Sequence, residues 1–524
     1  MDWLSRLNPR DCHPFGGELR RSFKYAAHLK RVFELRFSSL EVGRVHHVPT
    51  SFHFCREKDF PGLLMSIVMK FGGTSVADAA ALNNVAAIVA ARLSDSPVVV
   101  VSAMSGVTDA LLASSRLAVQ GDVDSAVASL QDVFWRHKAA ARELLGPYAA
   151  TSFIQHVDNV DVDISGLLRM INARPEARKA LNDQIVSNGE LLSSALFAEV
   201  LRAQGIVAEQ VDPRRCLITN DNHGCASPVI EESFRQTQAV VAPVVAAKVV
   251  PVIGGFVGAS TEGNTTTLGR GGSDYTAALL GAALKSDEIQ IWTDVTGVLT
   301  ADPRVVSEAQ TVERLSYGEA AELAYFGAKV LHPKTIQPAI ELGIKVRICN
   351  SRKPQETGTL VCAQGDTSPG TIKAIAHKAG ITTVQVTSAR MLGAYGFLRA
   401  LFEVFDRHRT VVDVVTTSEV SVSLSLDDAA ALPEIVKELE QLGTVRVEKG
   451  LAIICIVGEG LHGVPGIVGR VFSTISDISV SLISQGASSI NFTFVVEEGR
   501  VNEAVRRLHR EFFEADGRSI GVGT

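Results

Sequence analysis

The chain has 524 residues, of which 46% are apolar and 21% are charged, and its formal net charge at pH 7 is −6. This composition is typical of a folded protein of several domains. A nucleic-acid partner normally requires a basic excess, which 51 basic against 57 acidic residues do not supply. No uncharged apolar run reaches the roughly 18 residues of a membrane span. The seven cysteines are scattered without a Cys-x-x-Cys pair, so we expect a cytoplasmic enzyme without disulfides or structural zinc.

The first 64 residues differ from the rest of the chain. They are rich in Phe and His and show neither a helical nor a strand period. They are also neither acid-poor nor Ser-rich, as a transit peptide would be. Met65 then directly precedes an apolar segment. We therefore expect residues 1–64 to be an extension that is disordered or not native.

From residue 66 onward, apolar strands alternate with amphipathic helices. The expected strands are Ile67–Phe71, Val98–Val101, Ile206–Val211, Val250–Phe256, Glu288–Thr293 and Lys345–Cys349. The expected helices are one that carries Leu82, Val85, Val89 and Leu93 on one face, then Leu181–Ala203 and Asp274–Leu284. Strands that are apolar on both faces indicate a mostly parallel sheet covered by helices on both sides. The pattern predicts an α/β catalytic domain over residues 65–372.

After residue 372 the same order of elements occurs twice. The first set has strands at Thr382–Thr387, Val411–Val415 and Val420–Leu426 and helices at Phe397–His408 and Pro433–Leu442. The second has strands at Leu451–Val457, Val480–Ser484 and Ile490–Val496 and helices at Val464–Ile475 and Glu503–Phe512. A repeat about 70 residues long indicates two copies of one structural unit. We expect two small α+β modules, residues 373–447 and 448–524.

A glycine-rich turn follows the first strand, in the segment Lys70-Phe71-Gly72-Gly73-Thr74-Ser75. Glycines allow the backbone to approach a phosphate, and a helix that begins there presents free N–H groups. Lys70 adds a cation at the strand end. The segment lacks the Gly-Lys-Ser/Thr ending of a P-loop, so on its own it fits both a phosphate site and a plain strand–helix turn.

A second glycine-rich segment, Leu268-Gly269-Arg270-Gly271-Gly272-Ser273-Asp274, also leads into a predicted helix. The planar Arg270 guanidinium suits a carboxylate or phosphate, and Asp274 could orient a lysine or a magnesium ion. An ordinary loop with a helix cap is the alternative.

A third polar segment, Trp292-Thr293-Asp294, follows a strand end, where open parallel sheets bind ligands, although a surface loop fits equally well. Gly458–Gly463 matches the dinucleotide pattern Gly-x-Gly-x-x-Gly, but only 61 residues follow it, too few for a dinucleotide-binding domain. No Ser/His/Asp or Cys/His trio stands out.

Six motifs in order resemble those of aspartate kinase. They are Lys70–Ser75, Ser102–Thr108, Gly269–Asp274, Trp292–Asp294, Asp302–Arg304 and Gly327–Pro333. The two C-terminal modules resemble the tandem ACT modules of the monofunctional, lysine-sensitive members. The resemblance covers about residues 66–515. It implies the amino-acid kinase fold and the reaction ATP + L-aspartate → ADP + 4-phospho-L-aspartate, the entry to lysine, threonine and methionine synthesis.

The resemblance also implies roles for individual residues. Lys70 and Asp274 would be catalytic. ATP would be held by Lys70, Phe71, Gly72, Gly73, Thr293, Asp294, Arg304 and Lys329. Aspartate would be held by Thr108, Glu190, Arg270 and Ser273, with Glu190 on the α-ammonium group. Magnesium would arrive with ATP rather than in a cage of protein ligands.

The chemistry of this reaction agrees with the residues present. The side-chain carboxylate of aspartate is already ionised at pH 7, so no general base is required. The obstacle is the approach of an anion to a polyanion, which Lys70, Mg²⁺ and helix N-termini would screen. A non-catalytic amino-acid sensor on a relict kinase fold, or another amino-acid kinase, remains an alternative.

The first ACT module carries a candidate lysine site. Backbone N–H groups at Gly396, Phe397 and Leu398 would bind the α-carboxylate, because a predicted helix begins there. Two acidic side chains would meet the two ammonium groups. The complete set is Met391, Gly396, Phe397, Leu398, Val412, Asp413, Ser418 and Glu419. We expect feedback inhibition by lysine and a homodimer, or a dimer of dimers, assembled through the ACT modules.

Overall fold

The computed structural model describes residues 66–327, 331, 333–365, 371–393, 395–486 and 488–514. The predicted extension 1–64 lies outside the described residues, and so does Lys329. No helix in the part of the chain that the structure describes is long and apolar enough to cross a membrane.

An eight-stranded sheet forms the first part of the fold, with strand order β3-β5-β2-β1-β8-β10-β11-β9. The strands are β1 Ile67–Phe71, β2 Pro97–Val101, β3 Ala208–Val211, β5 Val250–Gly254, β8 Glu288–Thr293, β9 Arg314–Ser316, β10 Lys345–Asn350 and β11 Thr359–Cys362. All pairs are parallel except β10 with β11. The predicted mostly parallel sheet is confirmed.

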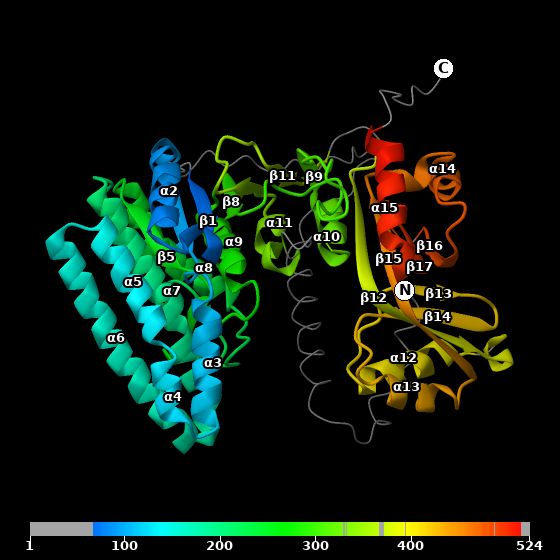
Figure 1. Ribbon diagram of the computed structural model, residues 1–524, viewed down its shortest axis with the longest axis horizontal. Coiled ribbons are helices and arrows are strands. Elements are labelled where there is room, and N and C mark those ends of the chain that lie inside the picture. Colours follow the sequence, from blue (N-terminus) through cyan, green and yellow to red (C-terminus); the bar gives the residue numbers. More distant parts are fainter. Residues whose placement is uncertain are drawn as a thin grey trace, which may run out of the picture. The chain divides into compact units, whose positions relative to one another are not determined.

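Helices cover both faces of this sheet (Figure 1). They are α2 Ala79–Ala90, α3 Val107–Val119, α4 Val123–Ala128, α5 Gln131–Leu144, α6 Pro147–Ala173, α7 Arg178–Ala203, α8 Ile230–Ala246, α9 Gly272–Leu284, α10 Tyr317–Tyr325 and α11 Gln337–Glu341. Alternate residues of a strand pack on opposite faces of the sheet, because successive side chains of a strand point to opposite sides. In β1, Met69 and Phe71 pack in the cluster with α2 to α7, and Val68 packs in the cluster with α8 and α9.

Two helix predictions need correction. The apolar period places Leu93 on the face of the first helix, but α2 ends at Ala90 and Leu93 is 43% exposed in a separate short turn. The helix expected directly after Gly72 is only the 3₁₀ turn Gly73–Val76, because Asp78 accepts from Ala81 N and begins α2 there.

A smaller sheet of β4 Ile218–Thr219, β6 Val257–Ser260 and β7 Thr265–Thr267 carries the loop that leads to α9. Asp183 on α7, fully buried, holds this region in place. Its carboxylate accepts from the backbone N–H groups of Gly224 and Thr267 and from the Thr267 hydroxyl.

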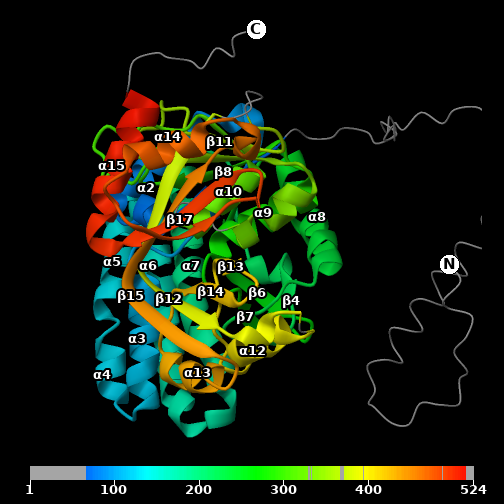
Figure 2. The same cartoon turned by 90° about the vertical axis from the view of Figure 1, so that its right-hand side faces the viewer.

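The C-terminal part forms one six-stranded antiparallel sheet, with order β13-β14-β12-β15-β17-β16 (Figure 2). Its strands are β12 Ala374–Thr387, β13 Val415–Thr417, β14 Ser421–Leu426, β15 Thr444–Val457, β16 Val480–Ser484 and β17 Asn491–Glu497. Its helices are α12 Phe397–Arg407, α13 Leu432–Leu439, α14 Ile467–Thr474 and α15 Val501–His509.

Strands β12 and β15 pair along their whole length, from Ala374 with Val457 to Thr387 with Thr444. The first half of β12 therefore lies beside the half of β15 that pairs with β17, and its second half pairs with β14. Each module uses one half of both long strands. The residue 447/448 boundary expected from the sequence falls inside β15.

The strand expected at Val411–Val415 is wrong in its position, since the strand is β13 Val415–Thr417. Ser425 explains the shift. Its hydroxyl accepts from Val414 N at 2.9 Å, so a side chain takes a place where a backbone carbonyl would continue the ladder.

Candidate active site

A cavity of about 560 Å³ opens at the carboxyl ends of β1, β2 and β8. Its lining includes most of the site residues predicted from the sequence, namely Lys70, Gly72, Gly73, Thr108, Glu190, Arg270, Ser273, Asp274, Thr293 and Asp294. These residues come from separate segments of the chain. The parallel sheet brings them together because its strand ends meet at one edge.

Lys70 and Asp274 form an ion pair in this cavity, with Lys70 Nζ 2.6 Å from Asp274 Oδ1. Their side chains are 12% and 18% exposed, so both charges are largely withdrawn from water. Lys70 lies near the end of β1 and Asp274 in the first turn of α9. The ammonium group is therefore fixed by a carboxylate on a different element, and it still borders the cavity.

Two α-helices begin at the cavity wall. Gly106 precedes α3 with φ 78°, and Gly271 precedes α9 with φ 75°. Both glycines are in the left-handed region of backbone conformation, which glycine adopts at little cost. Neither helix has a side-chain cap. The Val107 and Gly272 N–H groups donate to the Met104 and Gly269 carbonyls at 3.0 Å. The N–H groups that follow them in each first turn are therefore the ones that can bind an anion in the cavity.

Glu190 on α7 is 4% exposed, and its Oε2 atom is buried without a hydrogen-bond partner among the described residues. Burial raises the pKa of Glu190 to about 8, against the opposing effects of the Ala103 N–H and the nearby Lys70 charge. A buried carboxyl with an unsatisfied oxygen is costly unless a donor arrives. The site fits a ligand that brings a cation to this position.

Arg270 is exposed at the cavity wall and makes no hydrogen bond or ion pair with a described residue. Ser273 lies behind it, tightly packed against the backbone at the end of β5. A Cβ atom on Gly255 would lie 2.6 Å from Ser273 Cβ, so only glycine fits there. Gly255 thus lets the first turn of α9 approach the end of β5, and Gly254 lets the same strand end approach the Glu190 backbone on α7.

The nucleotide side of the cavity is built at the end of β8. The Gly72 N–H donates to the Trp292 carbonyl at 3.1 Å, which fixes the glycine turn against the strand end. Thr293 and Asp294 follow on the cavity wall, with the Thr293 hydroxyl donating to Asp294 Oδ1 at 3.2 Å.

Two of the described site residues predicted from the sequence do not line the cavity. The Phe71 side chain is fully buried and stacks on Trp292, with ring centroids 5.8 Å apart. Arg304 makes paired hydrogen bonds with Asp302 in an exposed loop, and its side chain is 88% exposed. Within the Asp-Pro-Arg motif, Arg304 therefore pairs with Asp302 and does not line the cavity. Lys329 is outside the described residues.

Other parts of the cavity wall are absent from the predicted set of site residues. The segment from Ser102 to Gly106 lies on the wall, and so does Phe256. The signals for them are present in the sequence: a Ser/Gly-rich stretch directly after β2, and the Gly-Gly pair at the end of β5. Both follow fully buried strands, where a ligand edge is expected.

The residues predicted to bind the effector lysine lie in two segments of the first module, one at the start of α12 and one on either side of β13. Gly396 precedes this helix with φ 82°, and Met391, Phe397 and Val412 pack against one apolar cluster of the first module. Leu398 is 41% exposed on the first helical turn. Ser418 and Glu419 follow β13, where the Ser418 and Ser421 hydroxyls lie 2.8 Å apart.

Asp413 has a different environment from the one expected, because it contacts the catalytic part of the chain. The Tyr325 hydroxyl at the end of α10 donates to it, and Asp427, paired with Lys378, lies beside it. Burial and the neighbouring Asp427 raise the pKa of Asp413 to about 6.

Comparisons with known proteins agree with this geometry. Residues 65–350 match the amino acid kinase family model and residues 454–512 match an ACT domain model. Lysine-sensitive aspartokinase 3 of Escherichia coli is 38% identical over 470 residues, covering 86% of this chain and 99% of that protein. The chloroplastic aspartokinase 1 of Arabidopsis thaliana is 37% identical, covering 86% and 81%.

Solved structures give the same result. E. coli aspartokinase III in complex with aspartate and ADP has a TM-score of 0.71, and its complex with lysine and aspartate has 0.72, both at 38% identity and 86% coverage of this chain. The Clostridium acetobutylicum aspartate kinase has 0.70 at 27% identity. The chain belongs to the aspartokinase family.

Proposed function

We propose that the cavity transfers the γ-phosphoryl group of ATP to the side-chain carboxylate of L-aspartate. The observation that carries this proposal is a cavity wall that combines the Lys70–Asp274 pair, a buried carboxyl with one oxygen that has no partner, and a guanidinium without a partner among the described residues. An amino acid with two carboxylates satisfies the last two features at once. Glu190 binds its ammonium group and Arg270 binds a carboxylate.

The reacting carboxylate is its own nucleophile and gives up no proton. Catalysis therefore rests on position and electrostatics. Lys70 faces the phosphoryl group, and Asp274 keeps the ammonium group at the end of β1. The N-terminal turns of α3 and α9 direct N–H groups at the charge that spreads over the phosphoryl oxygens.

Magnesium fits this site as a companion of the nucleotide. Among the described residues no cluster of three or more His, Cys, Asp or Glu could hold a metal ion. Asp274 and Asp294 line the cavity and supply hard oxygen ligands beside the phosphates. When bound, Mg²⁺ would neutralise phosphate charge, and these two carboxylates would hold it.

The test is ADP release with aspartate, glutamate and N-acetylglutamate as separate acceptors, with formation of the acyl phosphate trapped by hydroxylamine. We expect turnover with aspartate alone. Turnover with another acceptor instead would assign the site to a different amino-acid kinase. The absence of turnover with all three, in a folded protein that binds aspartate, would favour a sensor.

We further propose that lysine binds the first ACT module and inhibits the enzyme. The first module combines the left-handed start of α12 with two acidic groups, Asp413 before β13 and Glu419 after it. This set would suit a ligand with two ammonium groups and one carboxylate. The similar E. coli aspartokinase III has been crystallised with lysine.

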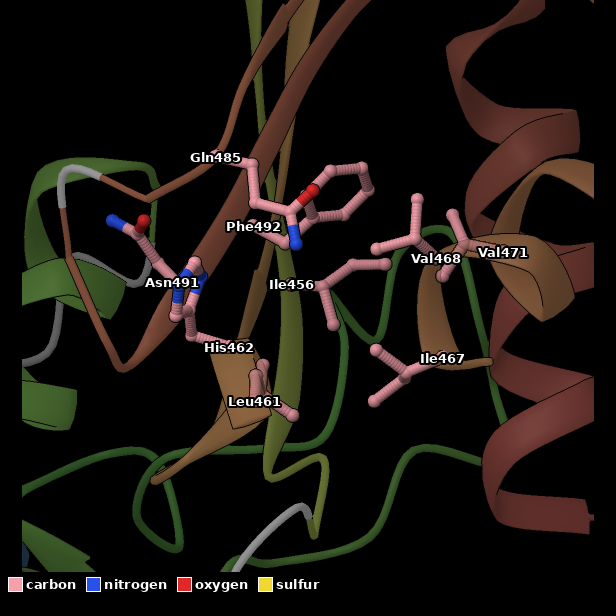
Figure 3. Close-up of a pocket in the computed structure, with 9 residues that line it drawn as sticks. All are labelled: Ile456, Leu461, His462, Ile467, Val468, Val471, Gln485, Asn491 and Phe492. Carbon is pink, nitrogen blue, oxygen red and sulfur yellow. The ribbon is translucent and has the colours of Figure 1, made fainter. Parts of the chain in front are cut away.

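The second module is a poor alternative for this effector. The loop before α14, which corresponds to the one before α12, borders a cavity of only about 10 Å³, space for about one water molecule. Figure 3 shows why: Ile456, Val468 and Phe492 turn toward the same space. An amino acid does not fit there without rearrangement.

A homodimer through the first module is part of this proposal. Strand β13 is the edge of the six-stranded sheet and all three of its residues are exposed. Val411, Val415 and Val420 on or beside it are 70%, 37% and 39% exposed. An exposed apolar edge strand is a ready pairing surface. A cytoplasmic location is proposed too, since Cys216, Cys225, Cys349, Cys362 and Cys455 are free thiols.

A further inference from the structure

A second cavity of about 410 Å³ lies at the beginning of α7, away from the residues assigned to catalysis. Its wall is formed by the last turns of α3, by Ile171 of α6, by the first turns of α7 and by the loop at His223 and Gly224. We call it the α7 cavity. Helices α3, α6 and α7 lie side by side around it (Figure 1).

The first turn of α7, which lines the α7 cavity, carries two cations where the helix dipole is already positive. Helix α7 has 26 residues, its preceding residue Ala177 provides no side-chain cap, and its first turn holds no acid. Instead Arg178 and Lys179 occupy this turn, both on the cavity wall. A helix N-terminus is the positive end of the helix dipole, so cations there are unfavourable.

These cations have no anionic partner among the described residues. Arg116 and Lys179 make no hydrogen bond or ion pair with any of them, and Arg178 donates only from Nε to the Ile171 carbonyl at 3.3 Å. Glu176, two residues before Arg178, is exposed and makes no ion pair with a described residue. Asp183 is fully buried and already bonded to His223 and to backbone N–H groups. Positive charge therefore accumulates without compensation.

An independent observation comes from a buried hydroxyl on the same wall. Ser115 is 3% exposed, lines the α7 cavity, and its Oγ atom has no hydrogen-bond partner among the described residues. A buried polar group without a partner is costly, and each such group in a folded protein calls for an explanation. A ligand in the cavity that accepts a hydrogen bond would supply one.

We infer that the α7 cavity is a binding site for a small dianion, a phosphate monoester whose apolar part lies against Val119 and Ile171. The Arg178 N–H already donates to the Pro175 carbonyl. The three cations, the next N–H groups of the first turn of α7 and the Ser115 hydroxyl would all donate to the phosphate oxygens. His223, held by Asp183 through Nδ1 at 3.0 Å, completes the wall. The bound dianion would then neutralise the cations at the N-terminus of α7. Departures from the usual sequence preferences of helix ends are expected at binding sites.

The test measures binding of phenyl phosphate by isothermal titration calorimetry, with the active site saturated by ADP, Mg²⁺ and aspartate. Inorganic phosphate is the second probe, because it lacks the apolar part. We expect one phenyl phosphate per chain, bound more tightly than inorganic phosphate. Arg178→Ala and Lys179→Ala should each weaken it at least tenfold. If inorganic phosphate bound as tightly as phenyl phosphate or more tightly, the proposed contact of an apolar group with Val119 and Ile171 would be wrong.

Arg174→Ala is the matched control, since Arg174 precedes the same helix, is exposed and does not line the cavity. The affinity of this variant for phenyl phosphate should equal that of the wild type. A loss as large as in Arg178→Ala or Lys179→Ala would mean that the effect comes from the net charge of the protein and not from the cavity. Absence of saturable binding to the wild type would overturn the site.

A second readout keeps the inference testable if a variant is unstable. Lys179→Glu replaces an unfavourable cation by an acid at a helix N-terminus. It should raise the thermal unfolding temperature of the ligand-free protein and abolish phenyl phosphate binding. A fall in unfolding temperature would contradict the charge conflict on which the inference rests.

Discussion

Asp274 supplies the one carboxylate that pairs with Lys70 among the described residues. Because Asp274 lies 2.6 Å away on α9, the ammonium group is positioned before any nucleotide arrives. Preorganisation of this kind is what makes a single cation effective against the charge of a transferring phosphoryl group.

Lys70→Ala should therefore lower kcat by about 10²–10³-fold and leave the fold intact. ADP release with aspartate measures the loss, and circular dichroism checks the fold. Lys437→Ala, at a position on α13 far from the cavity, is the matched control and should keep full activity. If the Lys70 variant keeps more than about a tenth of the wild-type kcat, Lys70 has no such role.

Glu190 makes the stability of the ligand-free protein depend on pH. Its pKa is raised to about 8 by burial, so between about pH 4.5 and 8 the folded state keeps a proton that the unfolded state loses. The free energy of unfolding must then fall as pH rises through this window. Glu190→Gln removes the effect. Its thermal unfolding temperature, relative to that of the wild type, should increase from pH 5 to pH 8, and an unchanged difference would contradict the buried neutral carboxyl.

The same group gives a signature of substrate binding. An ammonium group beside Glu190 favours the ionised carboxylate, so aspartate binding at pH 7 should release about one proton. Calorimetry in two buffers of different ionisation enthalpy counts that proton. The Glu190→Gln variant should release none.

At the scale of elements, the site depends on how closely β5 and α9 approach. Gly255→Ala would place a Cβ 2.6 Å from Ser273 Cβ and 2.7 Å from its Oγ, so the first turn of α9 must shift. A displacement of about 1 Å at reacting groups costs about 10²-fold. We expect aspartate kcat/KM to fall by that order with little change in secondary structure. Gly166→Ala on α6 is the control, because nothing lies within 4 Å of a Cβ atom added there. An equal fall in kcat/KM in this control would show that the close approach of Gly255 to Ser273 is not the cause.

The parallel strands and the site glycines could be predicted from the sequence, because buried strands and Gly-rich turns leave strong local patterns. The helices between Val107 and Ala173 were not predicted. They form a layer in which α3, α5 and α6 pack mainly on other helices. Among the described residues, no buried strands alternate with them to mark their positions in the sequence. Strands β12 and β15 were predicted at half their length, because each contains a glycine at positive φ, Gly380 and Gly450, which resembles a turn.

Arg304 shows another limit. Its motif predicted a nucleotide contact, but the Nε and Nη2 atoms of Arg304 donate to Asp302, two residues away, in this structure. Sequence alone cannot tell which of two oppositely charged groups a guanidinium selects, since the local pair forms without any long-range closure.

At the scale of the whole molecule, the regulatory sheet is joined to the catalytic part by specific polar contacts. Glu319 on α10 is fully buried and accepts from Glu459 N at 2.9 Å, and Asn491 donates to Glu322 at 2.6 Å. The Tyr325 hydroxyl of the same helix donates to Asp413. One helix of the catalytic part therefore contacts both modules. A ligand that changes the partners of Asp413 also changes a partner of α10, which is a physical route for coupling.

Lysine inhibition should accordingly depend on Asp413 and on pH. Coupling between two sites is typically about 1–3 kcal/mol, a 5–150-fold change in affinity, so millimolar lysine should inhibit the wild type clearly at pH 8. The pKa of Asp413 is raised to about 6 by burial and by Asp427, with Tyr325 and Lys378 as its other neighbours. Below that pH the carboxyl is protonated and loses the charge that an ammonium group binds. We expect inhibition at pH 5.5 to be weaker than at pH 8.

Asp413→Asn should be nearly insensitive to lysine at both pH values while its uninhibited rate is kept. Asp428→Asn is the matched control, since that exposed carboxylate only accepts from Ala430 N nearby. Initial rates of ADP release across a lysine series measure both. If the Asp413→Asn variant is inhibited as strongly as the wild type, or if inhibition of the wild type is the same at pH 5.5 and pH 8, Asp413 is not the residue that binds the effector.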